Sequence, residues 1–212
     1  MSEIYKRILS SIIILPISIF CIIRGNFFFN FFLILIFLIS FYEWTKISFK
    51  KKYLYFGYIF LIFSFYTVFE IRNYETDNNL FIFFFLLLIC IFTDIGGFIF
   101  GKIFKGPRLT KISPNKTYSG ALGGYLFSII MSFIAVKYVP DYILYGNYEF
   151  SLNQVIFIFI ISTVSQIGDI LISFFKRLSN VKDTGKIIPG HGGVLDRIDG
   201  MIFVFPFYYI FY

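Results

Sequence analysis

Charged residues are scarce in this sequence of 212 residues, and their scarcity excludes an ordinary soluble domain. Only 15% of the residues are charged, whereas soluble domains carry about 25%. Hydrophobic residues reach 58%, aromatic residues reach 24%, and the mean hydropathy is +0.80. A chain this apolar has too few polar side chains to cover its surface in water. The composition therefore predicts an all-α, polytopic integral membrane protein built as a helical bundle.

Cysteine and histidine are too few for the sites that they usually build. Cys21 and Cys90 lie alone in separate apolar runs, which excludes a disulfide framework and a zinc site. His191 is the only histidine of the sequence, and no Gly-x-Ser-x-Gly motif occurs. A hydrolase of the Ser–His–Asp type therefore has no support.

Seven apolar stretches approach the length of about 20 residues that a membrane-spanning helix needs. They cover residues 8–24, 27–45, 53–70, 79–101, 118–137, 152–175 and 197–212. The first follows Lys6 and Arg7, as in a signal peptide, but no small-residue cleavage site comes after it, so we expect a retained helix. The last reaches a spanning length only if its helix begins near Leu195. We therefore expect about seven transmembrane helices.

The net charge of +7 is explained mainly by where the basic residues lie along the chain. If the N-terminus is placed in the cytoplasm and the spans alternate, 16 of the 19 basic residues fall in inside segments. Only Arg24, Arg72 and Lys137 fall outside. This is the positive-inside pattern of membrane proteins. It predicts a cytoplasmic N-terminus and leaves little support for nucleic-acid binding.

The inside loop "GKIFKGPRLTKISPNKTYSG", residues 101–120, is more basic than topology alone requires. Five basic residues and no acidic one are interleaved with Gly, Pro, Ser and Thr. Backbone N–H groups, hydroxyls and point charges together suit the binding of phosphate. A solvated inside loop is the alternative interpretation, and the P-loop spacing G-x-x-x-x-G-K-[ST] does not occur.

Two aspartates, Asp94 and Asp169, interrupt apolar spans, where an ionisable group is costly and indicates a function. A structural role, as an ion-pair partner or a helix cap, is the alternative. Asp94 lies seven residues before Gly101, and Asp169 lies seven residues before Lys176. Both carboxylates should therefore lie roughly 10 Å inward from the cytoplasmic ends of their helices.

Asp196 and Asp199 lie at the start of the last apolar stretch and complete a layer of four carboxylates. Three residues apart, they would share one face of a helix. Four carboxylates repel one another, and a divalent cation such as Mg²⁺ relieves this, commonly with substrate phosphates as further ligands. Nearby cations could hold a polyphosphate: Lys176, Arg177, Lys182, Lys186 and Arg197. Such a site indicates phosphoryl or nucleotidyl transfer.

The polar segment "IIPGHGGVLDRIDG", residues 187–200, precedes that last stretch. Pro189, Gly190, Gly192 and Gly193 break any helix and let the backbone approach a ligand closely. His191 has two interpretations of equal weight. It is either a ligand or phosphate contact, or an interfacial residue bonded to a carbonyl.

The run "SFFKRLSNVKDTGKIIPGHGGVLDRID", residues 173–199, resembles the signature of the phosphatidate cytidylyltransferases, also called CDP-diacylglycerol synthases. It meets every fixed position of S-x-apolar-K-R-x4-K-D-x-small-x2-apolar-P/G-x-H-G-G-apolar-x-D-R-apolar-D. Further similar pieces are "GD" at 168–169, "TDIGGFIFGK" at 93–102, "SPNKTYSGALGG" at 113–124 and "EW" at 43–44. The N-terminal helices resemble the family only in character.

Three features depart from the family pattern. Gly97 and Phe98 stand where the family has Ala-Tyr, and Ser119 stands where it has Glu after S-P-x-K-T. The chain is also short for the family, so we expect one or more N-terminal helices to be missing. No proposed metal ligand is lost, and Ser119 leaves that loop without an acidic role.

The resemblance implies a nucleotidyltransferase that transfers a cytidylyl group from CTP to phosphatidate, giving CDP-diacylglycerol and pyrophosphate in phospholipid biosynthesis. It implies metal at Asp169, Asp196 and Asp199, with Mg²⁺ and a monovalent cation such as K⁺, and it implies a homodimer. Lys176 and Arg197 would join these aspartates in catalysis. The expected substrate-binding residues are Ser113, Lys116, Thr117, Ser173, Arg177, Lys182, Asp183, His191, Gly192, Gly193 and Asp94.

We expect N-terminal transmembrane helices over residues 1–78 and a catalytic transmembrane region over 79–212, with cytoplasmic loops at 101–117 and 176–196. The expected setting is the bacterial inner (cytoplasmic) membrane, with the site facing the cytoplasmic leaflet and no nucleic acid as partner. Two rival functions stay open. A lipid or isoprenoid kinase, or a relative that uses another lipid acceptor, is one. The other is an ion transporter, whose acids would lie near the midplane between repeated halves, and the sequence has no such repeat.

Overall fold

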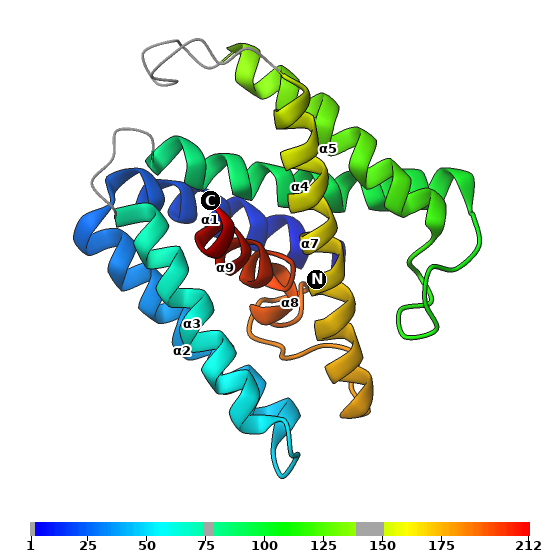
Figure 1. The fold of residues 1–212 in the computed structure, drawn as a ribbon. Coiled ribbons are helices and arrows are strands. Elements are labelled where there is room, and N and C mark those ends of the chain that lie inside the picture. Colours follow the sequence, from blue (N-terminus) through cyan, green and yellow to red (C-terminus); the bar gives the residue numbers. More distant parts are fainter. Residues whose placement is uncertain (1–2, 74–78, 139–150) are drawn as a thin grey trace.

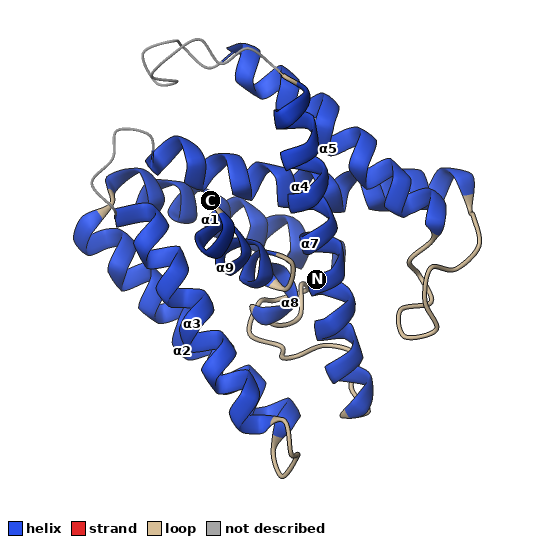
Figure 2. Cartoon of the chain, viewed as in Figure 1, coloured by secondary structure: helices blue, strands red, loops and turns tan. Residues whose placement is uncertain are grey.

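The protein is a bundle of helices in the computed structural model, which describes residues 3–73, 79–138 and 151–212 (Figure 1). Within these ranges Figure 2 shows helices joined by loops and no strand, which confirms the expected all-α class. The helices are α1 (Glu3–Arg24), α2 (Asn26–Ser48), α3 (Leu54–Asn73), α4 (Asn79–Phe104), α5 (Tyr118–Tyr138), α7 (Leu152–Leu178), α8 (Leu195–Ile198) and α9 (Met201–Phe211).

Five of these helices, α2, α3, α4, α5 and α7, are long and apolar enough to cross a membrane. This makes the chain a multi-pass membrane protein. The apolar part of α1, Leu9–Arg24, and the whole of α9 are shorter than a span. The expected count of seven spans and the cytoplasmic N-terminus therefore stay predictions. Two loops are also shorter than expected, because α4 continues to Phe104 and α7 continues to Leu178.

Glycines allow α4 and α5 to pack backbone against backbone. A Cβ added at Gly120 would lie 2.8 Å from the carbonyl oxygen of Gly97, and one added at Gly123 would overlap the ring of Phe100. Membrane helices approach one another most closely where small residues line the contact, because lipid supplies no hydrophobic force between them. The tight contact fixes the helix ends between which the basic loop, residues 105–117, is suspended.

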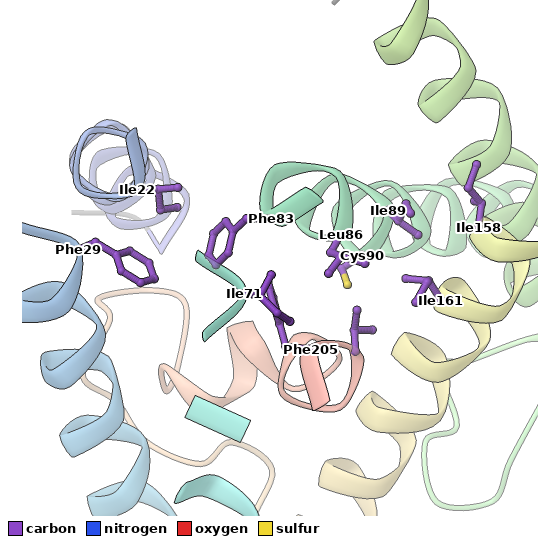
Figure 3. Close-up of a cluster of buried hydrophobic side chains, with 11 residues drawn as sticks. Ile22, Phe29, Ile71, Phe83, Leu86, Ile89, Cys90, Ile158, Ile161 and Phe205 are labelled. Atoms are coloured by element: carbon purple, nitrogen blue, oxygen red, sulfur yellow. The ribbon is translucent and has the colours of Figure 1, made fainter. Parts of the chain in front are cut away.

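The largest buried cluster joins the N-terminal helices to the C-terminal ones, as Figure 3 shows. Leu86 and Ile89 of α4 and Ile158 and Ile161 of α7 are fully buried there. Phe205 of α9 lies in the same cluster, so the short last helix is enclosed by the longer ones. α9 is thereby held in the middle of the bundle (Figure 1).

A second cluster holds the start of α8 against α2 and α3. Leu195 is fully buried beside Trp44 of α2 and Leu61 of α3. The Trp44 indole Nε1 donates to the Leu54 carbonyl at 3.1 Å, and Gly57 has no Cβ because the indole occupies that space. The last helical segment begins at Leu195, as expected from the sequence, and this packing fixes the position of the aspartates that follow.

Several helix ends and loops meet at one end of the bundle. The Ser179 hydroxyl, just after α7, donates to the Ile47 carbonyl of α2 and lies 2.9 Å from the Tyr53 hydroxyl. The Ser10 hydroxyl of α1 donates to the Pro189 carbonyl at 3.2 Å. Segments that the charge pattern assigned to one side of the membrane are thus neighbours, and the polar residues 187–200 lie among them.

Candidate active site

Lys116 of the basic loop reaches the aspartate of α7. Its ammonium group forms an ion pair with Asp169 and donates to the Gln166 carbonyl at 3.4 Å. The Ser173 hydroxyl, one turn after Asp169, donates to the same carboxylate at 3.4 Å. A cation of the predicted phosphate loop and a carboxylate of the predicted layer therefore lie together.

Asp199 lies beside Asp169, within hydrogen-bonding reach, where the junction of α8 and α9 meets α7. Burial in apolar surroundings, and then the negative charges of Asp169 and Asp94, raise the pKa of Asp199 well above its usual range. Its Oδ1 also accepts the Gly200 N–H at 3.0 Å. This pair is the part of the site in which bound positive charge would be most stabilising.

Gly168 makes the approach of Asp199 to α7 possible. A Cβ at this position would lie 3.0 Å from the Asp199 carbonyl oxygen and 2.6 Å from the ring of Phe203. Any larger residue would push the α8–α9 junction away from α7. The close packing of Asp199 and Phe203 therefore explains why a glycine precedes Asp169.

Asp94 joins this group from α4. The residue as a whole is exposed, and its carboxylate lies within electrostatic reach of Asp169, Lys116 and Arg197. Three of the four expected carboxylates, Asp94, Asp169 and Asp199, are therefore neighbours. Over the described ranges, however, no three His, Cys, Asp or Glu side chains lie close enough together to form a metal-binding group.

Asp196 has different partners from the other three aspartates. Its Oδ1 accepts the Lys176 ammonium at 2.8 Å, and its Oδ2 accepts the N–H groups of Thr184 at 2.8 Å and Gly193 at 3.0 Å. Both side chains of the ion pair are nearly buried. In this structure Asp196 and Lys176 hold the loop after α7 in place. The catalytic roles that the family resemblance implies for them stay predictions.

The glycines at the centre of the signature form a tight turn. The N–H groups of His191 and Gly192 both donate to the Ile188 carbonyl, at 3.0 and 3.2 Å. Gly190 and Gly192 have φ values of 76° and 92°, a conformation that favours glycine. The segment is non-helical, as expected.

His191 connects this turn to α1. Its Nδ1 lies 2.9 Å from the Ser10 hydroxyl and its Nε2 lies 3.4 Å from the Ser11 hydroxyl. Its backbone carbonyl accepts a hydrogen bond of 2.7 Å from Arg197, whose side chain is exposed. The ring therefore lies between the turn and α1, with hydroxyl groups near both of its nitrogens. Both interpretations of His191 stay predictions.

The other predicted cations lie at the rim. Arg177 donates to the Val181 carbonyl at 3.1 Å and closes the end of α7. Lys182, Asp183 and Lys186 are exposed in the loop that follows. These side chains are accessible to a charged ligand, in contrast to the buried Lys176.

A backbone turn and two hydroxyl groups fix the shape of the basic loop. The Ser113 carbonyl accepts the Lys116 N–H at 3.0 Å, and the Thr117 hydroxyl accepts the Gly120 N–H at 3.0 Å at the start of α5. The Ser119 hydroxyl accepts the Gly106 N–H at 3.2 Å. Ser113 and Thr117, predicted as substrate contacts, thus shape the loop that presents Lys116.

Glu43 is the residue whose role the sequence did not reveal. It lies in α2, is fully buried and contacts the signature loop. The signal was present, because Glu43 is an ionisable residue inside the apolar stretch 27–45, like Asp94 and Asp169 in theirs. Its partners lie far along the chain, and only the fold identifies them.

Comparisons with known proteins agree with the motifs. The model of the cytidylyltransferase family matches residues 49–212. A phosphatidate cytidylyltransferase of Rickettsia felis is 36% identical over 210 residues, which cover 96% of this chain and 90% of that protein. The Rickettsia conorii protein of the same name is 35% identical over 205 residues, 95% of this chain and 87% of its own. One from Staphylococcus saprophyticus is 40% identical over 136 residues, 63% and 50% of the two chains.

Proposed function

The chain belongs to the cytidylyltransferase family, and from this premise we propose that it transfers a cytidylyl group from CTP to phosphatidate. The products are CDP-diacylglycerol and pyrophosphate. The family expected from the signature is confirmed, and relatives that share the name align over nearly the whole chain. The enzyme is a nucleotidyltransferase in a multi-pass membrane protein, where a lipid substrate is within reach.

One observation of the structure carries the site assignment: the Asp169 carboxylate is paired with the Lys116 ammonium and interacts with the Asp199 carboxylate. In the reaction a phosphate oxygen of phosphatidate attacks the α-phosphorus of CTP. A new P–O bond forms, the bond to the bridging oxygen breaks, and pyrophosphate leaves. Both reactants are anions, so the protein has mainly to position them and offset their charge.

The chain's own cations have distinct tasks in this scheme. Lys116, held by its loop at Asp169, contacts the phosphates at the centre of the site. Arg197, Arg177 and Lys182 are exposed and hold the outer phosphates at the rim. The attacking phosphate is already ionised, so no strong general base is needed. His191 therefore serves to position the turn against α1.

The donors of the site fit a hard divalent cation. The neighbouring carboxylates of Asp169 and Asp199 supply oxygen ligands only, and Asp199 is buried close to the negative charges of Asp169 and Asp94. Mg²⁺ uses a few carboxylates together with substrate phosphates, and it would lower the cost of charge developing on the phosphates. Asp196 as a third ligand stays a prediction, because its oxygens accept hydrogen bonds from three protein donors. K⁺ as a second cation is a prediction from the family resemblance.

The setting that we propose is the bacterial inner membrane, with the site toward the cytoplasmic leaflet and the enzyme acting as a homodimer. The bacterial relatives and the accumulation of basic residues in segments 46–52, 102–116 and 176–197 support the orientation. The homodimer rests on the family resemblance alone.

The test of the function is an assay of the purified protein in detergent with radiolabelled CTP, phosphatidate and Mg²⁺. Labelled CDP-diacylglycerol and unlabelled pyrophosphate are expected when the label is in the cytidine. Parallel reactions with a polyprenol use CTP labelled in the γ-phosphate, because a lipid kinase would transfer that group to the lipid and leave CDP. Reactions with a polyprenyl phosphate and cytidine-labelled CTP test a relaxed choice of acceptor. Product with those acceptors, and none with phosphatidate, would overturn the proposal.

A further inference from the structure

A carboxylate of the membrane helix α2 is bonded to the signature loop. Glu43 has no exposed surface, and its two oxygens accept hydrogen bonds from three donors. Oε1 accepts the Val194 N–H at 3.0 Å. Oε2 accepts the Leu195 N–H at 2.8 Å and the Thr184 hydroxyl at 2.9 Å. All three donors are uncharged, and two of them belong to the backbone where α8 begins.

Glu43 and Asp196 bind the loop at the same two places. At the first place, the Thr184 side chain donates to Glu43 and the Thr184 N–H donates to Asp196. At the second, the N–H groups of Val194 and Leu195 donate to Glu43, while that of Gly193 donates to Asp196. Each of the two carboxylates therefore links one end of the loop, at residue 184, to its other end, at residues 193–195.

The loop glycines are adapted to this carboxylate. A Cβ at Gly185 or at Gly193 would overlap the Glu43 side chain, and one at Gly193 would also overlap the Thr184 hydroxyl. The sequence suggested that Gly193 lets the backbone approach a ligand, whereas in the structure it lets the backbone approach Glu43. A buried carboxylate is costly unless its oxygens are hydrogen-bonded, and the close backbone supplies those bonds.

We propose that Glu43 is a positioning residue of the active site. By holding the loop and the start of α8, it fixes Asp196 and the α8–α9 junction, and through that junction it sets Asp199 against Asp169. Glu43 does not touch substrate. The inference deepens the proposed function, on which its turnover measurement rests, and it assigns a site role to the N-terminal helices.

Glu43→Gln is the first variant because it keeps the size of the side chain while replacing the ionisable carboxyl group by a neutral amide, which has one acceptor oxygen and one NH₂ donor. Both oxygens of Glu43 accept backbone N–H groups, so the amide NH₂ of Gln would face a donor in either orientation. Thr184→Val and Thr184→Ser form a milder pair. Val removes the hydroxyl bonded to Glu43 at similar volume, and Ser retains it.

Two measurements are made on the full-length protein in detergent. Hydrogen exchange followed by mass spectrometry reports the amides of residues 184–195 without substrates. Steady-state kinetics then separate kcat, per folded enzyme, from the KM values for CTP and phosphatidate. For Glu43→Gln we expect exchange in this segment to be faster by about tenfold and kcat to fall by about tenfold or more. Both KM values should change much less.

The Thr184 pair carries the test if Glu43→Gln does not fold. Thr184→Val should show the same two changes at smaller size, and Thr184→Ser should behave like the wild type. Wild-type kcat in Glu43→Gln or in Thr184→Val, or a loss of kcat without faster exchange, would overturn the positioning role. If the wild-type protein made no CDP-diacylglycerol, the proposed function would fail instead, and the exchange comparison would still decide whether Glu43 holds the loop.

Discussion

The Lys116 ammonium is paired with the Asp169 carboxylate, and this ion pair joins the basic α4–α5 loop to α7. The pair places the strongest candidate for a phosphate contact beside the carboxylates of the site. Phosphate binding and cation binding can therefore take place at adjoining positions in the same layer.

Lys116→Ala should lower kcat/KM for CTP by about 10²-fold, the usual loss when one charge-stabilising group is removed. Lys105→Ala is the matched control, because Lys105 lies in the same loop with its side chain exposed. Steady-state rates at varied CTP measure both variants. Equal losses in the two would mean that the loop acts through its overall charge, contrary to a specific role for Lys116.

Asp196→Asn and Asp199→Asn should differ in thermal stability although the residues are neighbours in the sequence. Asp196→Asn leaves the nearly buried Lys176 without its counter-charge, which costs about 3–5 kcal/mol for a buried pair. Asp199→Asn removes a charge that burial, Asp169 and Asp94 disfavour. Its unfolding midpoint should therefore equal or exceed that of the wild type, with activity abolished.

Thermal unfolding in detergent, followed by fluorescence, measures this difference. A lower midpoint for Asp199→Asn than for Asp196→Asn would contradict the two environments that the structure gives these carboxylates. Near-normal turnover of Asp199→Asn would remove the residue from the proposed metal site.

Removal of divalent metal should abolish turnover, and Mg²⁺ should restore it. Binding to the folded state alone also raises stability, by about 2.7 kcal/mol at a concentration 100 times the dissociation constant. The wild type should therefore show a higher unfolding midpoint with Mg²⁺, and Asp199→Asn should show little of this increase. Full activity after chelation and dialysis would be incompatible with the proposed cation.

Gly168→Ala should impair turnover severely, because the added Cβ would contact the Asp199 carbonyl oxygen and the Phe203 ring. Gly97→Ala is its control. A Cβ at Gly97 would lie 3.6 Å from the nearest group, the Gly120 carbonyl oxygen, which is an ordinary contact. This second change also introduces the alanine of the family pattern, and near-wild-type rates are expected. Similar kcat values for the two variants would contradict the close packing of α7 on the α8–α9 junction.

The sequence predicts position along each helix better than rotation about its axis. The apolar stretches locate five spans and the start of the last helical segment at Leu195. Depth also brings Asp94 and Asp169 to the same layer. The spacing of Asp196 and Asp199, however, does not reveal that one carboxylate faces Lys176 and the other Asp169.

Partners that are distant along the chain account for the rest of what the sequence left open. Glu43 meets Val194 and Leu195, and Ser10 meets His191, across almost the whole length of the chain. Helical periodicity describes one segment at a time and does not indicate which segments pack together. The bonds of Glu43 to the loop over residues 184–195 and the position of His191 therefore follow only from the tertiary structure.

The most direct test of the central claim compares the wild type with Asp169→Asn for conversion of radiolabelled CTP and phosphatidate in the presence of Mg²⁺. We expect labelled CDP-diacylglycerol from the wild type and none above background from the variant, with a cooperative thermal transition showing that each protein is folded. No product from the wild type, or equal product from both, would contradict it.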